Sequence, residues 1–386
     1  MWNAGAKSFY IHGGLDGVSR ELMIICSFLK KSVSGRSLRV LIAQGLMRES
    51  TKENSKLLAS IQYIMLAVND TKSTTAVFLL TGIVGHEDVY LWISIPLCLV
   101  YAIVIIGNTG ILFIIKTDPS LHEPMYIFLS MLAITDLGLS ITTMPTTLGI
   151  FLFNSREISL DACFAQVFFI HSFSYTESSV LVSMAFDRFI AIRDPLRYAS
   201  ILTPLRIAKM GLVCVIRGVA LQFPFPFLLK RFQYWRVNVV SHSYCMHNDV
   251  MKLASADITV NNIYGFFIIL STVGLDSLLI LLSYVMILKT VLSIASRMES
   301  LRALNTCVSH LCAVLLFYIP MVSLAVIHRF GNSSSHLLQI FFGYIYVLVP
   351  PLMNPIVYSM KSKQLRVRII RMFRGSRQDM TDIIKP

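Results

Sequence analysis

Seven segments of this 386-residue chain are long and apolar enough to cross a lipid bilayer as helices, which takes roughly 20 residues each. Hydrophobic residues make up 55% of the chain and charged residues only 14%, which disfavours a soluble enzyme. The apolar runs do not alternate with polar residues, as the strands of a membrane barrel would. The sequence therefore predicts an all-α membrane protein, a seven-transmembrane helix bundle. We place its spans near Leu91–Ile115, Met125–Phe153, Cys163–Ile192, Ile207–Leu229, Asn262–Leu288, Ala303–Ile327 and Leu337–Met360.

The distribution of charge predicts how this bundle is oriented. The formal net charge is +13, but the basic residues lie mainly between the apolar segments, which indicates a lipid bilayer and no nucleic acid as partner. Lysine and arginine are concentrated after the first, third and fifth spans and in the tail, so these parts face the cytoplasm and the N-terminus is extracellular. The sequon Asn69-Asp70-Thr71 then lies outside, and we expect a glycan on Asn69.

The remaining sequence divides into an N-terminal and a C-terminal part. The first 64 residues are basic and contain no apolar run of helix length, and whether translation starts at Met1 or Met65 stays open. After the last span, Leu365, Ile369 and Phe373 recur every four residues among basic ones, which is typical of a helix lying on the inner leaflet. We therefore expect an atypical, disordered extension at 1–64, an extracellular N-terminus at 65–90, the bundle at 91–360, and a cytoplasmic amphipathic helix and tail at 361–386.

Carboxylates stand inside the predicted membrane region, where an uncompensated charge is costly. Asp136 lies in the second span and Glu177 in the third. Neighbouring carboxylates repel one another unless a proton or a cation lies between them, so this pair predicts a sodium site, with Ser178 or Asn354 as a further oxygen ligand. The same residues also fit a hydrogen-bonded structural network. Asp276 in the fifth span is interpreted as structural, and no other cofactor is expected.

Missing motifs exclude several functions. The sequence has no glycine-rich phosphate loop and no HExxH, GxSxG or CxxC motif, so we predict no enzyme activity. A retinal-binding pump would need a lysine in its last span, and Leu337–Met360 has none. A seven-helix channel or transporter is the alternative from another class. It would require inverted repeats or a continuous polar path, and we find neither.

The two ends of the third span carry different chemistry. Cys163 begins the span on the outer side, and Cys245 lies in the long loop between the fourth and fifth spans. Because the outside of the cell is oxidising, these cysteines can form a disulfide that holds the loop over the bundle. At the cytoplasmic end, Arg188 fits a membrane-surface anchor. Prolines such as Pro320 and Pro355 bend the sixth and seventh spans, which also indicates elements that move.

A series of motifs occurs in one order along the chain: Gly107-Asn108, Leu121-His-Glu-Pro-Met-Tyr126, Leu132-Ala-Ile-Thr-Asp136, Met184-Ala-Phe-Asp-Arg-Phe-Ile-Ala-Ile192, Pro195-Leu-Arg-Tyr198, Ser243-Tyr-Cys245, Thr306-Cys-Val-Ser-His310 and Pro351-Leu-Met-Asn-Pro-Ile-Val-Tyr358. Together they resemble the motifs of rhodopsin-like G-protein-coupled receptors, and more narrowly those of olfactory receptors. The resemblance extends from about Met65 to Phe373. Phe78-Leu-Leu-Thr-Gly-Ile83 and His328-Arg-Phe-Gly331 are similar to the class I, fish-like branch and to its family 51.

The resemblance implies a plasma-membrane receptor that binds a small odorant and activates a stimulatory olfactory G protein, which raises cyclic AMP. It implies that Asp187 holds Arg188 in the inactive state, and that Asn354, Pro355 and Tyr358 relay the change to the G protein. A receptor of this type that senses a small metabolite outside the olfactory epithelium is the alternative, and whether the gene product is functional stays open.

The resemblance also places a ligand pocket between the third, fifth and sixth spans, beneath the Cys245 loop. Polar residues follow one face of the third span at helical spacing, which indicates that this face lies inside the bundle. Arg329 near the outer mouth predicts a carboxylic acid as ligand, although it also fits a snorkelling side chain, and His171 also fits an ordinary interior histidine. Phe266 is expected beside Tyr318 in the apolar floor. The predicted ligand-binding residues are His171, Ser174, Tyr175, His247, Asn248, Tyr318 and Arg329.

Overall fold

The structure is a computed structural model that describes residues 77–82, 89–232, 234, 237–254, 257–294, 296–330 and 336–371. The chain divides into two compact units, Met1–Leu66 and Ala67–Pro386, and all the described residues belong to the second. The predicted extension at 1–64 and the predicted glycan site at Asn69 lie outside the described residues.

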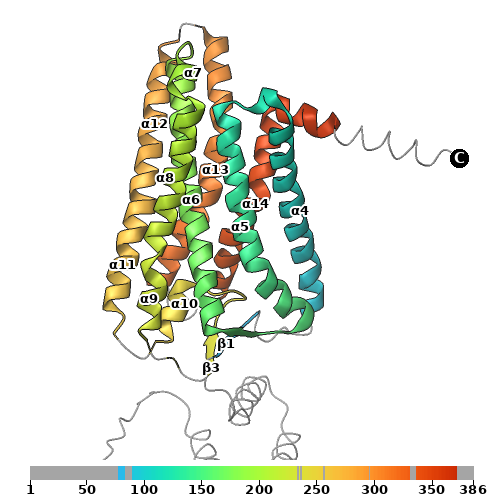
Figure 1. The fold of residues 1–386 in the computed structure, drawn as a ribbon, viewed down its shortest axis with the longest axis vertical. Helices are drawn as coiled ribbons and strands as arrows, with labels where there is room; N and C mark the ends of the chain where they lie inside the picture. The colour runs from blue at the N-terminus through green and yellow to red at the C-terminus, as the bar shows by residue number, and fades with distance from the viewer. Residues whose placement is uncertain are drawn as a thin grey trace, which may run out of the picture. The chain divides into compact units, whose positions relative to one another are not determined.

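A bundle of seven membrane-length helical segments forms this second unit, as predicted (Figure 1). Each segment agrees with a predicted span to within a few residues, except that the sixth begins earlier. The segments are α4 (Tyr90–Thr117), α5 (Pro124–Phe153), α6 (Leu160–Arg193), α8 (Pro204–Gln222) with α9 (Pro224–Lys230), α11 (Thr259–Ile269) with α12 (Leu275–Leu292), α13 (Arg297–Phe330) and α14 (His336–Lys361).

The fourth and fifth segments are interrupted, which the hydropathy pattern did not predict. Pro224 begins α9 directly after α8, and proline has no N–H to continue the helical hydrogen bonds. Between α11 and α12 lies the π-helical turn η3 (Leu270–Gly274). A π-turn inserts one residue into the helix and so changes which side chains face the bundle.

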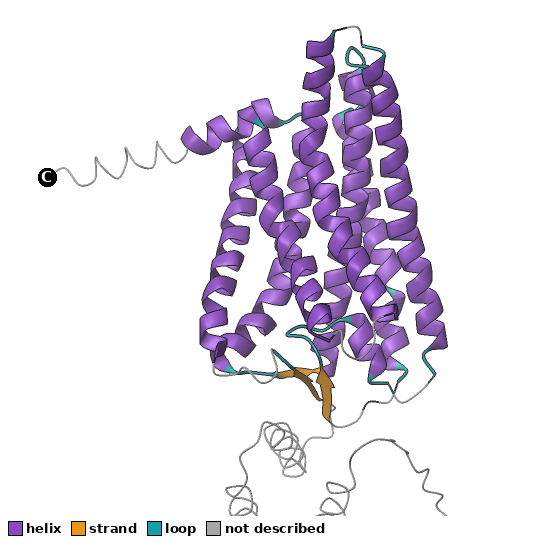
Figure 2. Cartoon of the chain, turned by 180° about the vertical axis from the view of Figure 1, so that it is seen from behind, coloured by secondary structure: helices purple, strands orange, loops and turns teal. Residues whose placement is uncertain are grey.

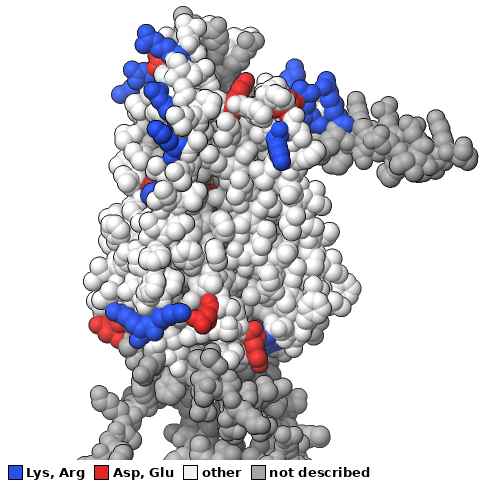
Figure 3. Space-filling model, viewed as in Figure 1, with Lys and Arg blue, Asp and Glu red and all other residues white. Residues whose placement is uncertain are grey.

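The third segment, α6, differs from the others in composition. Six helical segments are apolar enough to be recognised as membrane spans within the described residues, and α6 is not among them. It packs against α5, α8, α12 and α13, so its polar side chains contact protein instead of lipid. In Figure 3 the charged side chains on the visible face gather toward the two ends of the bundle, with a largely uncharged band between them.

Three short strands, which Figure 2 shows in orange at one end of the bundle, and a short helix form a cover there. The central strand, β1 (Val77–Leu80), precedes α4. It pairs antiparallel with β2 (Glu157–Ser159), which precedes α6, and parallel with β3 (Val237–Val240), which precedes the short helix. Phe78 in the central strand is fully buried, and its ring meets that of Tyr234 edge-on at 5.4 Å. We call these four elements the lid: β1 (Val77–Leu80), β2 (Glu157–Ser159), β3 (Val237–Val240) and α10 (His247–Lys252).

A disulfide between Cys163 and Cys245 joins the lid region to α6, as predicted. Gln166, one turn further along α6, reinforces this connection. Its side-chain oxygen accepts a hydrogen bond of 2.8 Å from the backbone N–H of Cys245, and its amide nitrogen donates to the carbonyl of Thr142 on α5 at 2.9 Å. The loop between α9 and α11 is therefore fixed to two helices.

At the other end, the chain turns after α14 into a second helical stretch at 363–371. Leu365 is fully buried against the bundle, Ile369 packs beside it, and Phe373 lies outside the described residues. Arg368 forms an ion pair of 2.5 Å with Asp118 in the turn after α4. Ser120 donates hydrogen bonds to Asp118 and lowers the pKa of that carboxyl, which keeps it charged for the ion pair.

Replacing either disulfide cysteine should destabilise the receptor, and the two losses should not add. A bridge of this loop length contributes about 4 kcal/mol to stability. We expect Cys163→Ser and Cys245→Ser each to abolish surface expression or response, with the double variant no worse than either single one. Surface staining of expressed protein measures this, and additive losses would show that the cysteines act independently.

Candidate functional site

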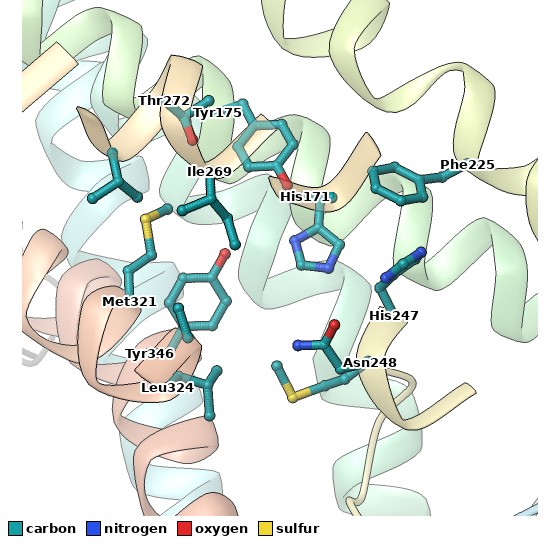
Figure 4. A pocket seen from close by; sticks show the side chains of 14 residues that line it. His171, Tyr175, Phe225, His247, Asn248, Ile269, Thr272, Met321, Leu324 and Tyr346 are labelled. Carbon is teal, nitrogen blue, oxygen red and sulfur yellow. The ribbon is translucent and has the colours of Figure 1, made fainter. Parts of the chain in front are cut away.

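A cavity of about 100 Å³ lies inside the lid end of the bundle (Figure 4). Helices α6, α9, α11, α13 and α14 form its walls, and the residues around α10 form its roof. The lining is mostly apolar, with a few polar groups that converge on the space, as is usual for small-molecule sites. It comprises His171, Tyr175, Phe225, Met246, His247, Asn248, Gly265, Ile269, Thr272, Val273, Met321, Leu324, Ala325 and Tyr346.

Four of the predicted ligand-binding residues line this cavity: His171, Tyr175, His247 and Asn248. The rings of His171 and Tyr175 are stacked at 5.8 Å, which holds both side chains on the inner face of α6. The position of these residues agrees with the predicted pocket, and their role in binding stays a prediction.

His247 offers a hydrogen-bonding group to the cavity. Its ring meets that of Phe225 edge-on at 4.1 Å, and its Nε2 is buried without a hydrogen-bond partner among the described residues. Burial, with a smaller contribution from His171, lowers the pKa of His247 to about 3. The imidazole is therefore neutral at physiological pH and can serve a ligand as a hydrogen-bond donor or acceptor.

Three other predicted pocket residues lie elsewhere. The hydroxyl of Ser174 accepts a hydrogen bond of 2.7 Å from Tyr346. Ser174 therefore orients Tyr346, which lines the cavity, without lining it itself. The hydroxyl of Tyr318 lies 2.8 Å from that of Ser178 and points into the packing between helices. Phe266 is 54% exposed on the outside of the bundle and does not form the floor. Phe266 thus differs from the expectation, because a hydrophobic pattern does not reveal which face of a largely apolar helix points inward.

Arg329, the predicted carboxylate ligand, lies in the last turn of α13. Its side chain is outside the described part of the structure. The lining residues that the structure describes include no lysine or arginine, so a cationic partner for an acidic ligand would have to come from outside this set.

An ion pair inside the bundle was missed by the sequence analysis. Arg217 on α8 donates to the Oδ2 atom of Asp276 on α12 at 2.9 Å, and Ser178 on α6 donates to the same oxygen at 2.6 Å. Arg217 also donates to the carbonyl of Ser271 in η3 at 2.7 Å, and thereby satisfies a backbone group at the π-turn. Ser178 is therefore hydrogen-bonded to this ion pair, and its role as a sodium ligand stays a prediction.

The signal for this pair was present in the sequence. Arg217 stands in the middle of the fourth apolar segment, and Asp276 stands in the middle of the fifth. Because a lone charge at such a depth is costly, each implied a partner of opposite sign. The sequence predicts a structural role for Asp276, and its ion pair and hydrogen bond agree with that prediction.

The predicted carboxylate pair lies deeper in the bundle. Asp136 and Glu177 are fully buried, and both face the side-chain nitrogen of Asn354. This nitrogen lies 3.1 and 3.2 Å from the two carboxylate oxygens of Asp136 and 3.4 Å from Glu177. The described residues contain no group of three or more His, Cys, Asp and Glu side chains arranged to hold a metal ion.

The opposite end of α6 carries the expected acid–arginine pair. Arg188 donates to the Oδ2 atom of Asp187 through Nε at 3.0 Å and through Nη2 at 2.7 Å. Tyr198, after α6, donates to the other oxygen of the same carboxylate at 2.6 Å. The asparagine and tyrosine of the last span also face the interior, since Asn354 and Tyr358 are both buried.

The chain is similar to known proteins both in sequence and in structure. Residues 97–376 match the family model described as olfactory receptor. Human olfactory receptor 51G2 is 64% identical over 305 residues, which cover 79% of this chain and 97% of that receptor. Human olfactory receptor 51G1 is 59% identical over 298 residues, with 77% and 93% covered. The crystal structure of squid rhodopsin has a similar fold, with a TM-score of 0.62 at 16% identity, and 75% of this chain and 87% of that chain are covered.

The Arg217–Asp276 pair yields a prediction about stability. Breaking a buried ion pair leaves one charge without compensation, which costs about 3 kcal/mol, whereas replacing both partners by apolar residues is often neutral. We expect Arg217→Met to lower the thermal midpoint of the purified receptor and Arg217→Met with Asp276→Leu to recover most of the loss. Additive losses, with the double variant losing as much as Arg217→Met and Asp276→Leu together, would contradict a direct interaction.

Proposed function

This chain belongs to the olfactory receptor family of rhodopsin-like G-protein-coupled receptors, and we propose that it binds a small odorant in the cavity beneath the lid and activates a stimulatory olfactory G protein that raises cyclic AMP. As a member of this family it is a multi-pass plasma-membrane receptor and not an enzyme. We place the lid end and the N-terminus outside the cell. The basic residues between the spans support this orientation, because they lie mainly toward the end of α6 that carries Arg188.

The cavity is the observation that carries this proposal. It is lined by helices that lead to the opposite end of the bundle, and its roof is fixed by the disulfide. A volume of about 100 Å³ suits a small molecule, and the apolar lining around Met321 and Leu324 favours a ligand with a short hydrocarbon part. The hydrogen-bonding groups of His171, His247 and Asn248 lie toward one side (Figure 4), which favours a polar group at one end of the ligand.

A short- to medium-chain carboxylic acid, or a similarly small polar odorant, is the ligand class we propose. A carboxylate is bound by the planar fork of a guanidinium through two parallel hydrogen bonds, and Arg329 in the last turn of α13 would supply it. His247, neutral by burial, would donate a further hydrogen bond without adding charge.

The ligand class is tested by measuring cyclic AMP in cells that express the full chain, against a panel of acids, alcohols and esters. We expect an acid as best agonist, with Arg329→Ala raising its half-maximal concentration about tenfold and Arg329→Lys restoring part of the loss, because lysine lacks the fork. A neutral ester or terpene as best agonist, indifferent to Arg329→Ala, would contradict the carboxylate proposal but not the receptor function.

Activation would proceed through the residues that the family resemblance singles out. Arg188 is held by Asp187, and we propose that this contact opens when α13 moves and that Arg188 then meets the G protein. Asn354, Pro355 and Tyr358 of α14 would relay the change from the cavity. Gly107 on α4 supports a tight packing at this point, since a Cβ there would lie 3.2 Å from the ring of Pro355.

A sodium ion between Asp136 and Glu177 is proposed as a modulator of this change. The donor set fits a hard cation, because two buried carboxylates flank one amide and neither makes an ion pair with a basic side chain among the described residues. The side-chain oxygen of Asn354 would serve as a further ligand once the amide turned over. The ion would supply positive charge that favours the inactive arrangement of the helices.

Glu177→Ala tests this proposal. Removing one carboxylate should raise basal cyclic AMP and flatten the dependence of agonist potency on sodium concentration, because the remaining acid holds the ion less tightly. Ser178→Ala is a suitable control, since Ser178 is engaged by Asp276 and should leave the sodium dependence in place. Basal signalling and salt response that do not change in Glu177→Ala would leave only the hydrogen-bonded network.

A further inference from the structure

A buried histidine connects the lid region to α14, outside the cavity lining. His242 follows β3 and is 1% exposed. Its Nδ1 lies 2.5 Å from a carboxylate oxygen of Asp249 on α10, and its Nε2 lies 3.2 Å from the backbone carbonyl of Gln339 on α14. One imidazole thus bridges the lid helix and the first turns of the last membrane helix.

The carboxylate oxygen of Asp249 and the carbonyl oxygen of Gln339 face the two ring nitrogens of His242, and both are hydrogen-bond acceptors when Asp249 is ionised. A neutral imidazole has a single N–H and can donate to only one of them. Two hydrogen bonds require a proton on each nitrogen, or one on Nε2 and one shared between Nδ1 and the carboxylate. In either arrangement the bridge holds two protons, and loss of one brings two lone pairs face to face.

The position of the ring leaves it little freedom to avoid this conflict. A Cβ on Gly343 would lie 3.0 Å from two atoms of the His242 ring, which shows that the ring lies directly against the backbone of α14. Beside it, Tyr244 donates to the carbonyl of Gly343 at 2.7 Å, and the hydroxyls of Ser243 and Tyr344 lie 2.6 Å apart. The segment around His242 is therefore laid along α14.

Several other ionisable groups lie around His242. From α10 these are Asp249 and Lys252, whose ammonium lies 3.9 Å from that carboxylate, and from the lid segment and α14 they are Tyr244 and Tyr344. Carboxylates ordinarily titrate near pH ~4, and lysine and tyrosine near pH ~10. Histidine is the side chain that ordinarily exchanges its proton between about pH 5 and about pH 8.

We propose that His242 is a proton-operated latch that holds the lid on α14 when the bridge carries both protons and loosens the lid when one is lost. The latch acts on the cavity because Met246, His247 and Asn248, which line the roof, follow in the same short segment. Mildly acidic conditions outside the cell therefore close the roof, and alkaline conditions loosen it. This inference concerns the lid alone and does not depend on the identity of the ligand or the G protein.

The latch is tested by hydrogen–deuterium exchange of the full chain in lipid nanodiscs without ligand, at about pH 6 and about pH 8. Exchange rates are corrected for their intrinsic pH dependence. We expect the amides of residues 237–251 to lose protection about tenfold at the higher pH, the factor that corresponds to one charge-assisted hydrogen bond. Wild-type protection that is equal at both pH values would overturn the proposal.

Variants distinguish a proton-dependent latch from a general loss of lid stability. His242→Gln, which does not titrate, should show the same lid protection at both pH values, and a wild-type pH dependence in this variant would refute the latch. If His242→Gln does not fold, Asp249→Asn takes its place and should also reduce the pH dependence of lid protection. An unchanged pH dependence in Asp249→Asn would contradict the proposal. His122→Gln, an exposed histidine in the turn after α4, is the matched control and should behave like wild type. Loss of the dependence in this control would also overturn the assignment.

Discussion

The need to satisfy polar groups that α6 carries through the centre of the bundle governs the rest of the structure. In a bilayer there is no water to solvate them, so they depend on partners within the protein. Two helices supply partners to α6: Asp276 on α12 bonds to Ser178, and Asn354 and Tyr346 on α14 bond to Glu177 and Ser174. The surrounding helices can be apolar because α6 is not.

These contacts lie in three layers that follow one another along α6. The cavity layer contains His171 and Tyr175, the middle layer contains Ser178 with the Arg217–Asp276 pair, and the far layer contains Asp187 and Arg188. The layers are linked through elements that touch two of them. The π-turn η3 contributes Thr272 to the cavity and, through Ser271, a carbonyl to Arg217. The cavity and the middle layer therefore share the π-turn η3 as a common structural element.

Much of this arrangement was predictable from the sequence, and the failures have identifiable causes. Six of the seven segments follow from hydropathy alone, whereas α6 is less apolar. The Cys163–Cys245 bridge follows from the oxidising compartment that the sequence predicts for both cysteines. The positions of Tyr318 and Phe266 could not be predicted from hydropathy, because they depend on which face a nearly all-apolar helix turns inward. The π-turn in the fifth span changes that face further, and no spacing rule reveals it.

Some contacts between polar groups could likewise be predicted from the sequence, and others could not. That Asp136 and Glu177 would meet around Asn354 could be predicted, since three isolated polar residues in apolar segments have few partners to choose from. The same reasoning applied to Arg217 would have found Asp276. The His242–Asp249 bridge lies in a loop, where polar residues are common and no burial is expected, and only the coordinates show that both side chains are enclosed.

The central position of β1 has a consequence for how the protein is made. This strand precedes the first membrane helix, yet one of its neighbours, β3, is synthesised only after the fourth. Thr81 illustrates the delay, because its hydroxyl and its backbone N–H both bond to the carbonyl of Val240, 159 residues later. Until α8 and α9 have been synthesised, the edge of β1 that pairs with β3 has no partner strand, and an unpaired edge can pair with other chains. The lid is therefore completed only after four of the seven helical segments have been made.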